Sequence, residues 1–444
     1  MQISNSLTVQ RVPIDAVGPS DAPFRRHPAT ELNKIRKSFE KFGVVNPLLV
    51  TRNGTIVDGE ARWQVLKESG ASYIEVIVIA DRSSAELKTL RLALNRIGED
   101  AKWDSSNIRI ALEDIAAERI DLDFTGFDTP ESDHYLNLDL LQANVEENGS
   151  DIPPVDVRAV SSPGAIWRLG NHSVGCGSAT DLAFVSRVLD GRAASVCFVD
   201  PPYNIKVDGF ITGKGRHRHR EFVQGAGEMS TDEYFGLLRD SFLVLKESCS
   251  PRALMYACID WRHVMEMTVA GRACDMPLYT ICVWTKTNGG MGGIYRNAHE
   301  LVCVFRAGTE APLDNVELGR HGRNRTNVWS YPGMSSFGKE RDKLLGSHPT
   351  VKPVTMIADV LRDVTKRGDI VLDTFLGSGS TLMAAQETGR ICCGVELDPL
   401  YVDVAIRRWQ NATGREAVLT ETGEPFNDVA QRLLAAPSES NDGA

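Results

Sequence analysis

Residues 370–397, IVLDTFLGSGSTLMAAQETGRICCGVEL, decide the fold of this chain. An apolar run enters a turn rich in glycine, a helical segment follows over residues 381–388, and a second apolar run, ICCGVEL, comes next. A strand, a glycine-rich turn, a helix and a second strand make a βαβ unit, in which the glycines let the backbone approach a ligand closely. The stretch therefore predicts an α/β domain that binds a ligand at the carboxyl ends of its strands.

Similar apolar runs surround this stretch and alternate with helical patterns. They read AASVCFVD (193–200), RALMYACI (252–259), LYTICVWT (278–285) and ELVCVFRA (300–307). Runs that are apolar along their whole length are typical of parallel strands with both faces buried. We therefore expect an α/β fold with a mostly parallel sheet that is covered by helices on both faces.

The nine cysteines include no CxxC pair, and Cys392 and Cys393 lie in a run expected to be a buried strand. This pattern fits neither a disulfide framework nor a zinc site, so we predict small buried thiols in a reducing compartment and no metal. The longest largely apolar stretch, residues 73–80, is too short to span a bilayer, and MQISNSLTVQ lacks the order of a signal peptide. We expect a cytoplasmic protein without a membrane partner.

The tetrapeptide Asp200-Pro201-Pro202-Tyr203 directly follows one of the apolar runs. Two prolines stop the strand and fix its carboxyl end, the edge at which open α/β sheets bind ligands. Asp200 and the carbonyl of Pro201 could accept hydrogen bonds from an aromatic amino group, which is otherwise a poor nucleophile. Tyr203 could stack on a base that is turned out of a duplex. The alternative is a plain strand exit with a solvated aspartate.

Acidic and aromatic residues accompany the glycine-rich turn. Glu396 ends the following run and could accept hydrogen bonds from a ribose diol. The loop holds no basic residue and GxGxxG is incomplete, so we expect a nucleoside ligand without a pyrophosphate. If the nucleoside carries a cationic methionine group, Asp373 would lie beside it through charge and Phe375 through a cation–π contact.

A third segment, His348-Pro349-Thr350-Val351-Lys352-Pro353, precedes a helix that leads to the glycine-rich strand. Its lysine, Lys352, could bind the carboxylate of an amino-acid ligand, and its threonine offers a hydroxyl. The alternative is a capped loop with a solvated lysine.

Four motifs in this order, DPPYN, HPTVKP, DTFLGSGST and GVELDPLY, resemble those of the amino-group DNA methyltransferases in the β arrangement, where the catalytic motif precedes the cofactor motif. The resemblance implies a Rossmann-like fold, S-adenosylmethionine as cofactor, double-stranded DNA as substrate and methyl transfer to the amino group of a flipped base. It assigns catalysis to Asp200, Pro201, Pro202 and Tyr203. It assigns cofactor binding to Asp373, Phe375, Gly377, Ser378, Gly379, Thr381, Glu396, His348, Pro349, Thr350 and Lys352.

Within this family an aspartate at the first position of the tetrapeptide is typical of adenine-N6 enzymes, and a serine is typical of cytosine-N4 enzymes. Asp200 therefore favours adenine N6, with cytosine N4 as the alternative. The family has Gly-Asp in its opening segment, whereas Ser178 follows Gly177 here. Loss of that aspartate could lower activity, or Asp181 could compensate for it.

Basic residues gather in two segments rich in glycine, arginine and histidine, although the net charge of the chain is −10. We predict that residues 205–227 and 308–346 are loops for DNA binding and target recognition, with solvated loops as the alternative. His217 and His219 fit a phosphate-facing patch better than a metal site. The predicted DNA contacts are Lys206, Lys214, Arg216, Arg218, Arg220, Arg320, Arg323 and Arg325.

The first part of the chain alternates short helices and strands. Residues 28–43 predict a helix with Thr30 as N-cap and Gly43 as its stop. A hairpin around Asn53-Gly54, a helix over residues 60–69 and a strand over residues 73–80 follow. From residue 84 to about residue 117 the pattern is helical. This part therefore predicts a small α+β module followed by a helical extension.

Arg25, His27 and the segment VDGEAR (57–62) resemble the N-terminal ParB/sulfiredoxin domain. In partition proteins the equivalent patch binds CTP or phosphates through a helix N-terminus and arginines. Here the patch is Gly59, Glu60 and Arg62, and Arg62 is the one arginine present of the two in partition proteins. Binding of CTP or ATP, docking on DNA and a purely structural role all stay open.

The expected domains are a ParB-like domain (1–95), a helical extension (96–143), a linker (144–157), the methyltransferase domain (158–415) and an acidic tail (416–444). Double-stranded DNA is the expected partner, and a homodimer and a cognate restriction nuclease stay open. The alternative from another class is a ParB-like DNA-binding regulator with an inactive methylase half, for which Ser178 is the support.

Overall fold

The computed structural model describes residues 8–20, 24–80, 82–97, 103–118, 120–136, 152–156, 158–205, 225, 227–286, 294–316, 325–332 and 351–435. The chain divides into two compact units, Met1–Ala143 and Asn144–Ala444. Most of the predicted linker therefore lies outside the described residues.

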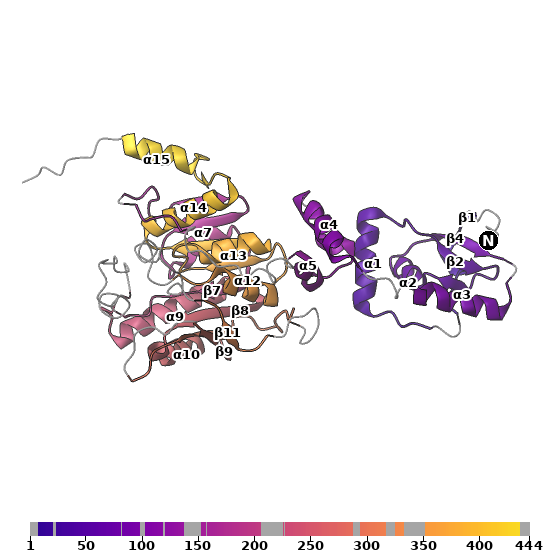
Figure 1. Ribbon diagram of the computed structural model, residues 1–444, viewed down its shortest axis with the longest axis horizontal. Helices are drawn as coiled ribbons and strands as arrows, with labels where there is room; N and C mark the ends of the chain where they lie inside the picture. The colour runs from indigo at the N-terminus through magenta and orange to yellow at the C-terminus, as the bar shows by residue number, and fades with distance from the viewer. Residues whose placement is uncertain are drawn as a thin grey trace, which may run out of the picture. The chain divides into compact units, whose positions relative to one another are not determined.

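The first unit is built on a four-stranded sheet in the order β1-β4-β2-β3 (Figure 1). Its strands are β1 (Val9–Pro13), β2 (Leu48–Thr51), β3 (Ile56–Asp58) and β4 (Tyr73–Ile79). The predicted hairpin is confirmed, because β2 and β3 pair antiparallel across a turn in which Gly54 has a φ of 78°. β4 pairs parallel with β2 and antiparallel with β1.

The described part of this unit also holds the helices α1 (Ala29–Phe42), α2 (Glu60–Glu68), α3 (Ser84–Ile97), α4 (Ser105–Ala117) and α5 (Thr129–Leu136) and the 3-10 turns η1 (Ile14–Ala16) and η3 (Leu122–Thr125). α1 matches its predicted range, but its N-cap is Pro28, so the prediction of Thr30 was wrong. The long helical region forms two helices, α3 and α4. Lys34 pairs with Glu131, and this contact ties α1 to α5.

The second unit holds a ten-stranded sheet in the order β11-β9-β10-β8-β7-β12-β13-β6-β5-β14. The five central strands, from β8 to β6, are parallel to one another, which confirms the predicted mostly parallel sheet. β10 runs antiparallel to both β8 and β9, and β5 antiparallel to both β6 and β14. The strands are β5 (Ile166–Leu169), β6 (His172–Cys176), β7 (Ala194–Val199), β8 (Cys249–Ile259), β9 (Leu278–Thr285), β10 (His299–Arg306), β11 (Val328–Ser330), β12 (Ile370–Asp373), β13 (Ile391–Glu396) and β14 (Val418–Leu419).

Helices cover both faces of this sheet, as a Rossmann-like fold requires. α7 (Leu182–Leu189), α9 (Thr231–Glu247) and α10 (Val264–Ala273) pack in one buried apolar cluster with the sheet. α12 (Val354–Val364), α13 (Ser380–Thr388) and α14 (Pro399–Thr413) pack in a second cluster, and Figure 1 shows α12 beside α13. A further turn, η5 (Trp261–His263), leads into α10.

The last described segment belongs to the same core. β14 pairs with β5, and α15 (Phe426–Ala435) begins with Phe426, whose ring lies 5.1 Å from that of Trp167. The predicted boundary at residue 415 was therefore too early, because an apolar anchor inside an acidic segment holds it on the sheet. Residues 436–444 lie outside the described residues.

The nine cysteines are free, and eight of them are buried, including Cys392 and Cys393 on β13. No cluster of His, Cys, Asp or Glu suited to a metal ion occurs among the residues described above. Within the same residues, no helix has the length and apolar character needed to cross a membrane.

Candidate active site

The two decisive sequence motifs meet at one edge of the sheet. β7 and β12 are neighbouring parallel strands, with Val196 opposite Val371 and Cys197 opposite Leu372. Parallel neighbours place their carboxyl ends side by side, so Asp200 and the glycine-rich turn occupy the same edge. The sheet order thus joins residues that are far apart in the chain.

Asp200 sits in a tight polar cluster. Its Oδ1 accepts a hydrogen bond from the Tyr203 hydroxyl at 2.8 Å, and its Oδ2 pairs with Lys352 Nζ at 2.6 Å. The lysine also lies over the Tyr203 ring, 5.3 Å from the centroid. The aspartate is therefore held on both oxygens, and the alternative of a solvated strand exit is wrong.

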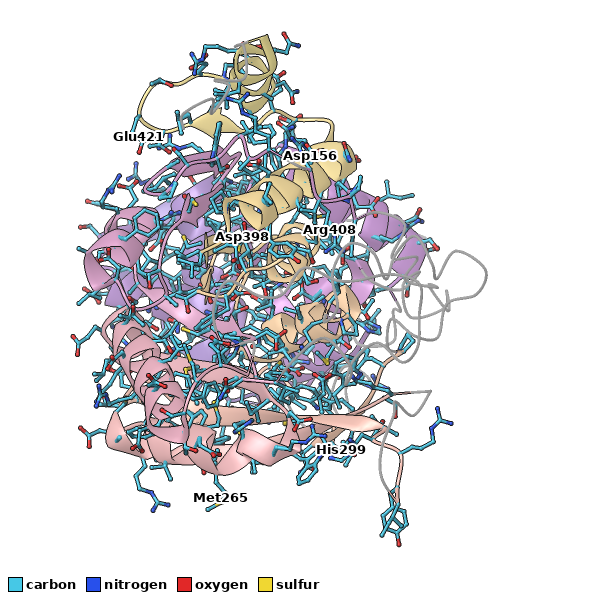
Figure 2. The ribbon with its side chains drawn as sticks, turned by 90° about the vertical axis from the view of Figure 1, so that its left-hand side faces the viewer. Asp156, Met265, His299, Asp398, Arg408 and Glu421 are labelled. Carbon is cyan, nitrogen blue, oxygen red and sulfur yellow. The ribbon has the colours of Figure 1, made fainter. Side chains whose placement is uncertain are left out.

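Glu300 is a second carboxylate in this cluster that the sequence did not single out. It lies near the start of β10, and because β10 is antiparallel to β8, Leu301 pairs with Ile259 at the carboxyl end of β8. Figure 2 shows His299, the first residue of β10, at this end of the strand. Glu300 Oε2 lies 3.1 Å from the Tyr203 hydroxyl.

Two lysines compensate the charge of Glu300. Lys352 Nζ lies 3.3 Å from Oε2, and Lys286, at the end of β9, lies 2.5 Å from Oε1. Burial opposes ionisation, but the two ammonium groups overcome it and hold the pKa of Glu300 at about 2. Burial raises the pKa of Asp200 above its ordinary value; Lys352 works against this rise and Glu300 adds to it. Two neighbouring carboxylates thus have opposite pKa shifts.

The glycine-rich turn brings backbone amides close to this edge. Gly377 and Gly379 have φ values of 53° and 85°, and Gly379 is the N-cap of α13. A Cβ on Gly379 would lie 3.0 Å from the Cβ of Ala405 on α14. Two features therefore require a glycine at position 379: the close approach of α14 and the left-handed backbone conformation.

Asp373 ends β12 just before this turn and is 3% exposed. Its Oδ1 accepts a hydrogen bond from the Phe375 amide at 2.9 Å, and Thr381 also donates to its carboxylate. Burial nonetheless raises the pKa of Asp373 to about 7. The next residue, Thr374, has a buried hydroxyl without a hydrogen-bond partner in the described part of the chain. A buried acid beside an unpaired hydroxyl is what a site for a cationic polar ligand would present.

Glu396 lies beside the same turn, at the end of β13. Its Oε2 accepts from the Gly377 amide at 2.8 Å and its Oε1 from the Asp398 amide at 2.9 Å. A carboxylate has further lone pairs, so the contact to a ribose diol stays a prediction that its hydrogen bonds allow.

Arg408 on α14 contacts the glycine-rich turn, and this contact was not predicted from the sequence. Its guanidinium lies 3.4 Å from the Ser378 carbonyl and 3.4 Å from the Ser380 hydroxyl, and the residue is buried. Figure 2 labels Arg408, which lies on α14, and Asp398, the N-cap residue before that helix. A helical arginine carries no sequence signal for such a contact.

Comparison with known proteins follows the two units. The profile of a family described as DNA methylase matches residues 194–407, and that of the ParB N-terminal domain matches residues 2–95. A protein of Escherichia coli K12 named "Putative methylase YubD" is 30% identical over 226 residues, which cover 50% of this chain and 84% of YubD.

This chain belongs to the amino-group (N6/N4) DNA methylases and carries an N-terminal ParB domain. The Type II methyltransferase M2.DpnII of Streptococcus pneumoniae is 26% identical over 233 residues, 49% of this chain and 82% of that protein. Among solved structures, the M1.HpyAVI–SAM complex has 17% identity and a TM-score of 0.39 and covers 53% of this chain and 97% of its own.

Ser178 stands where the family resemblance predicts an aspartate, and its hydroxyl bonds the Thr180 hydroxyl at 2.9 Å within the turn after β6. Asp181 accepts a hydrogen bond from the Phe184 amide at 3.0 Å and is the N-cap of α7. The cap uses one carboxylate oxygen, so compensation for the missing aspartate by Asp181 stays a prediction.

Most of the predicted DNA contacts of the methylase lie outside the described residues. These DNA contacts are Lys206, Lys214, Arg216, Arg218, Arg220, Arg320 and Arg323, together with His217 and His219. Three residues of the predicted cofactor site also lie outside the described residues: His348, Pro349 and Thr350. Arg325 is described, and it pairs with Asp359 at 3.2 Å and with Asp363 at 2.7 Å, both on α12. Its guanidinium is thus neutralised within the methylase unit, and its contact to DNA stays a prediction.

In the ParB domain, the predicted patch surrounds the start of α2. Gly59 is the N-cap with a φ of 98°, and Arg62 lies 2.7 Å from Asp58 and donates to the Asn46 carbonyl at 3.1 Å. Glu60 lies in the first turn of α2.

The two other members of the patch have partners elsewhere in the ParB domain. Arg25 donates to the Asn95 carbonyl at 3.3 Å, and His27 lies 3.1 Å from Glu31. The role of the patch stays a prediction.

Proposed function

We propose that this methylase transfers a methyl group from S-adenosylmethionine to N6 of adenine in a specific sequence of double-stranded DNA. The observation that carries the proposal is the placement of Asp200 beside the glycine-rich turn, on the adjoining strands β7 and β12. A flipped base held at Asp200 and a cofactor held at the turn would meet at one sheet edge.

S-adenosylmethionine, the methyl donor of DNA methylases, supplies an electrophilic methyl group on a sulfonium when it is bound. Asp373 would face its cationic part, the amides of Gly377 and Gly379 would approach it closely, and Glu396 would accept from its ribose. Phe375, Ser378 and Thr381 shape the same turn. The buried acid and the unpaired Thr374 hydroxyl described above fit this ligand.

Asp200 and Pro201 act on the nucleophile. The lone pair of an exocyclic amino group is delocalised into its ring, so acceptors that hold the N–H groups favour the pyramidal, reactive form. Asp200 keeps lone pairs on both oxygens beyond those used by Tyr203 and Lys352. The Pro201 carbonyl adds a second acceptor, the ring of Tyr203 stacks on the base, and the proton released on transfer leaves to Asp200 or to water.

Adenine is favoured because the first residue of the tetrapeptide is an aspartate. Mass spectrometry of nucleosides from cells that express the protein tests this choice directly. N6-methyladenine supports the proposal, N4-methylcytosine replaces it by the alternative, and the absence of both in DNA would support a regulator with an inactive methylase half.

The transfer itself is tested with tritiated S-adenosylmethionine and unmethylated DNA. Asp200→Ala should abolish incorporation of label while the melting temperature and the circular dichroism spectrum show an intact fold. Undiminished incorporation in this variant would refute the assignment of Asp200.

DNA is the substrate of the family, and two further partners belong to the proposal. A cognate restriction nuclease would make the pair a restriction–modification system, and a second copy of the chain would make a homodimer. Protection of expressing cells' DNA against a set of nucleases tests the first, and sedimentation of the full chain tests the second.

A further inference from the structure

The charged cluster around Asp200 extends beyond the residues that a methyl transfer requires. We propose that Lys352 and Glu300 are positioning residues, in which Lys352 holds the Asp200 carboxylate in its acceptor orientation and Glu300 anchors both Lys352 and the Tyr203 hydroxyl. This inference rests on the proposed function of Asp200. It differs from the sequence-based expectation that Lys352 binds the carboxylate of the cofactor.

The geometry leaves Lys352 little freedom. Its side chain is 4% exposed, and its ammonium contacts Asp200 at 2.6 Å and Glu300 at 3.3 Å. An ammonium has three donors, so two of them are already used by carboxylates. Leaving this position would deprive Asp200 and Glu300 of their shared counter-ion, which is strongly unfavourable for acids that are mostly buried. We therefore expect Lys352 to stay with the catalytic carboxylate when the cofactor binds.

Glu300 fixes the other side of the cluster. The Tyr203 hydroxyl has one hydrogen and lies between Asp200 at 2.8 Å and Glu300 at 3.1 Å, so it donates to one carboxylate at a time. Lys286 holds Glu300 from the far side. The base-stacking ring of Tyr203 is thus fixed by the same carboxylate that anchors Lys352.

The groups that face Asp200 come from several elements. Lys352 precedes α12, Glu300 lies on β10, Cys258 on β8 and Asp373 at the end of β12, with Tyr203 from its own loop. Among these groups Lys352 is the cation, so its removal leaves burial and like charge to raise the pKa of Asp200 further. Removal of the Glu300 charge has the opposite effect.

The consequence is a pair of shifts with opposite signs. Asp200 offers both oxygens as acceptors, and can take up the released proton, only while it is ionised, so the acid limb of the rate profile follows its pKa. Lys352→Met should move that limb to higher pH by about one unit or more, and Glu300→Gln should move it to lower pH. Lys352→Arg, which keeps the charge, should leave it near the wild-type position.

The experiment measures single-turnover methyl transfer against pH for the full chain with DNA. On the acid side of the limb Lys352→Met should lose about tenfold or more in rate, as a shift of about one unit or more requires, and should regain it as the pH rises, while the KM for S-adenosylmethionine changes little. The matched control is Lys246→Met, since Lys246 also joins an acid, Asp275 at 3.7 Å, but lies on α9 away from the cluster. It should leave the profile unchanged.

Two results would overturn the inference. A raised KM for S-adenosylmethionine with an unmoved profile would return Lys352 to the cofactor. A lower melting temperature with an unmoved profile in both variants would make the cluster merely structural.

A second readout does not depend on activity. Carbon-13 NMR of carboxyl-labelled aspartate follows the titration of Asp200, whose signal is assigned by its loss in Asp200→Asn. The titration should move up in Lys352→Met and down in Glu300→Gln, even if the protein methylates no DNA. If the Asp200 titration is unshifted in both variants, the inference is refuted. If the wild-type protein transfers no methyl group to DNA, the proposed function is refuted instead.

Discussion

The two units contain the same local structure, used in different surroundings. In the ParB domain β3 ends at Asp58, Gly59 adopts a left-handed conformation and α2 begins. In the methylase unit β12 ends at Asp373, and Gly379 adopts the same conformation before α13. Neither helix has a side-chain cap at its N-terminus.

The two aspartates differ in their partners. Asp58 has an ion pair with Arg62, which covers the glycine so closely that a Cβ there would lie 2.9 Å from the guanidinium. Asp373 is buried, and across the described ranges no lysine or arginine lies within ion-pair distance of it. An acid that the chain neutralises itself closes a site, whereas a buried acid without a cation favours a cationic ligand from outside.

Gly379→Ala should have the largest effect. The new Cβ meets Ala405, and the left-handed conformation costs about 1–2 kcal/mol for alanine. Because the turn must shift, affinity for S-adenosylmethionine should fall by about a hundredfold, or about 2.7 kcal/mol. Isothermal titration measures the affinity, and chemical denaturation measures the free energy of unfolding.

Gly389→Ala is the matched control for this prediction. Gly389 also has a positive φ, 69°, but lies at the other end of α13. It should lose similar stability and keep the affinity. Equal loss of affinity in both variants would remove the special role of the turn.

Asp373→Asn should come next. The amide keeps an acceptor for the Phe375 amide but removes the charge that would face a sulfonium. Charge-assisted contacts contribute about 1.5–3 kcal/mol, so affinity for S-adenosylmethionine should fall by about thirtyfold. S-adenosylhomocysteine lacks the sulfonium charge, and its affinity should change much less. If both ligands weaken alike, Asp373 is not the partner of the cation.

The pH dependence of cofactor binding should be smaller. The pKa of Asp373 is raised to about 7, and its ionised form is the one that binds a cation. Binding therefore releases a proton, so affinity should rise by about tenfold between about pH 6 and pH 8 and then level off. Titration calorimetry in buffers of different ionisation enthalpy measures the proton release. Asp373→Asn should abolish the dependence, and a wild-type affinity that falls with pH would contradict the sign.

Asp58→Asn in the ParB domain should have the smallest effect. The Asp58–Arg62 pair is partly exposed, so the free energy of unfolding should change by less than about 1 kcal/mol. Release of Arg62 next to an uncapped helix should raise the affinity of the full chain for CTP or ATP severalfold. Arg62→Met is the control and should lower it. If neither variant nor the wild type binds a nucleotide, the patch is structural or docks on DNA.

The sequence predicted what depends on local pattern. The βαβ unit, the strand exit at Asp200 and the hairpin at Gly54 follow from short motifs whose chemistry acts over a few residues. The family resemblance added the order of the motifs. For Lys352 the sequence predicted a lysine that binds a carboxylate, but it did not predict that Asp200 supplies this carboxylate.

The site residues that the sequence did not predict depend on the order of strands in the sheet. Glu300 joins the cluster around Asp200, and Lys286 reaches Glu300, because β10 is inserted antiparallel between β9 and β8, which brings the start of one strand to the ends of others. Nothing in NAHELVCVF marks that reversal. The anchor Phe426 was missed for a similar reason, since one apolar residue in an acidic segment has no periodicity to reveal it.

The two outermost strands of the large sheet are its shortest. β11 has three residues and β14 has two, at opposite ends of ten strands. Each offers few unpaired backbone groups to a strand from another molecule, so edge-to-edge growth into aggregates is disfavoured. A wide sheet full of apolar strands is thereby protected during synthesis and at high concentration.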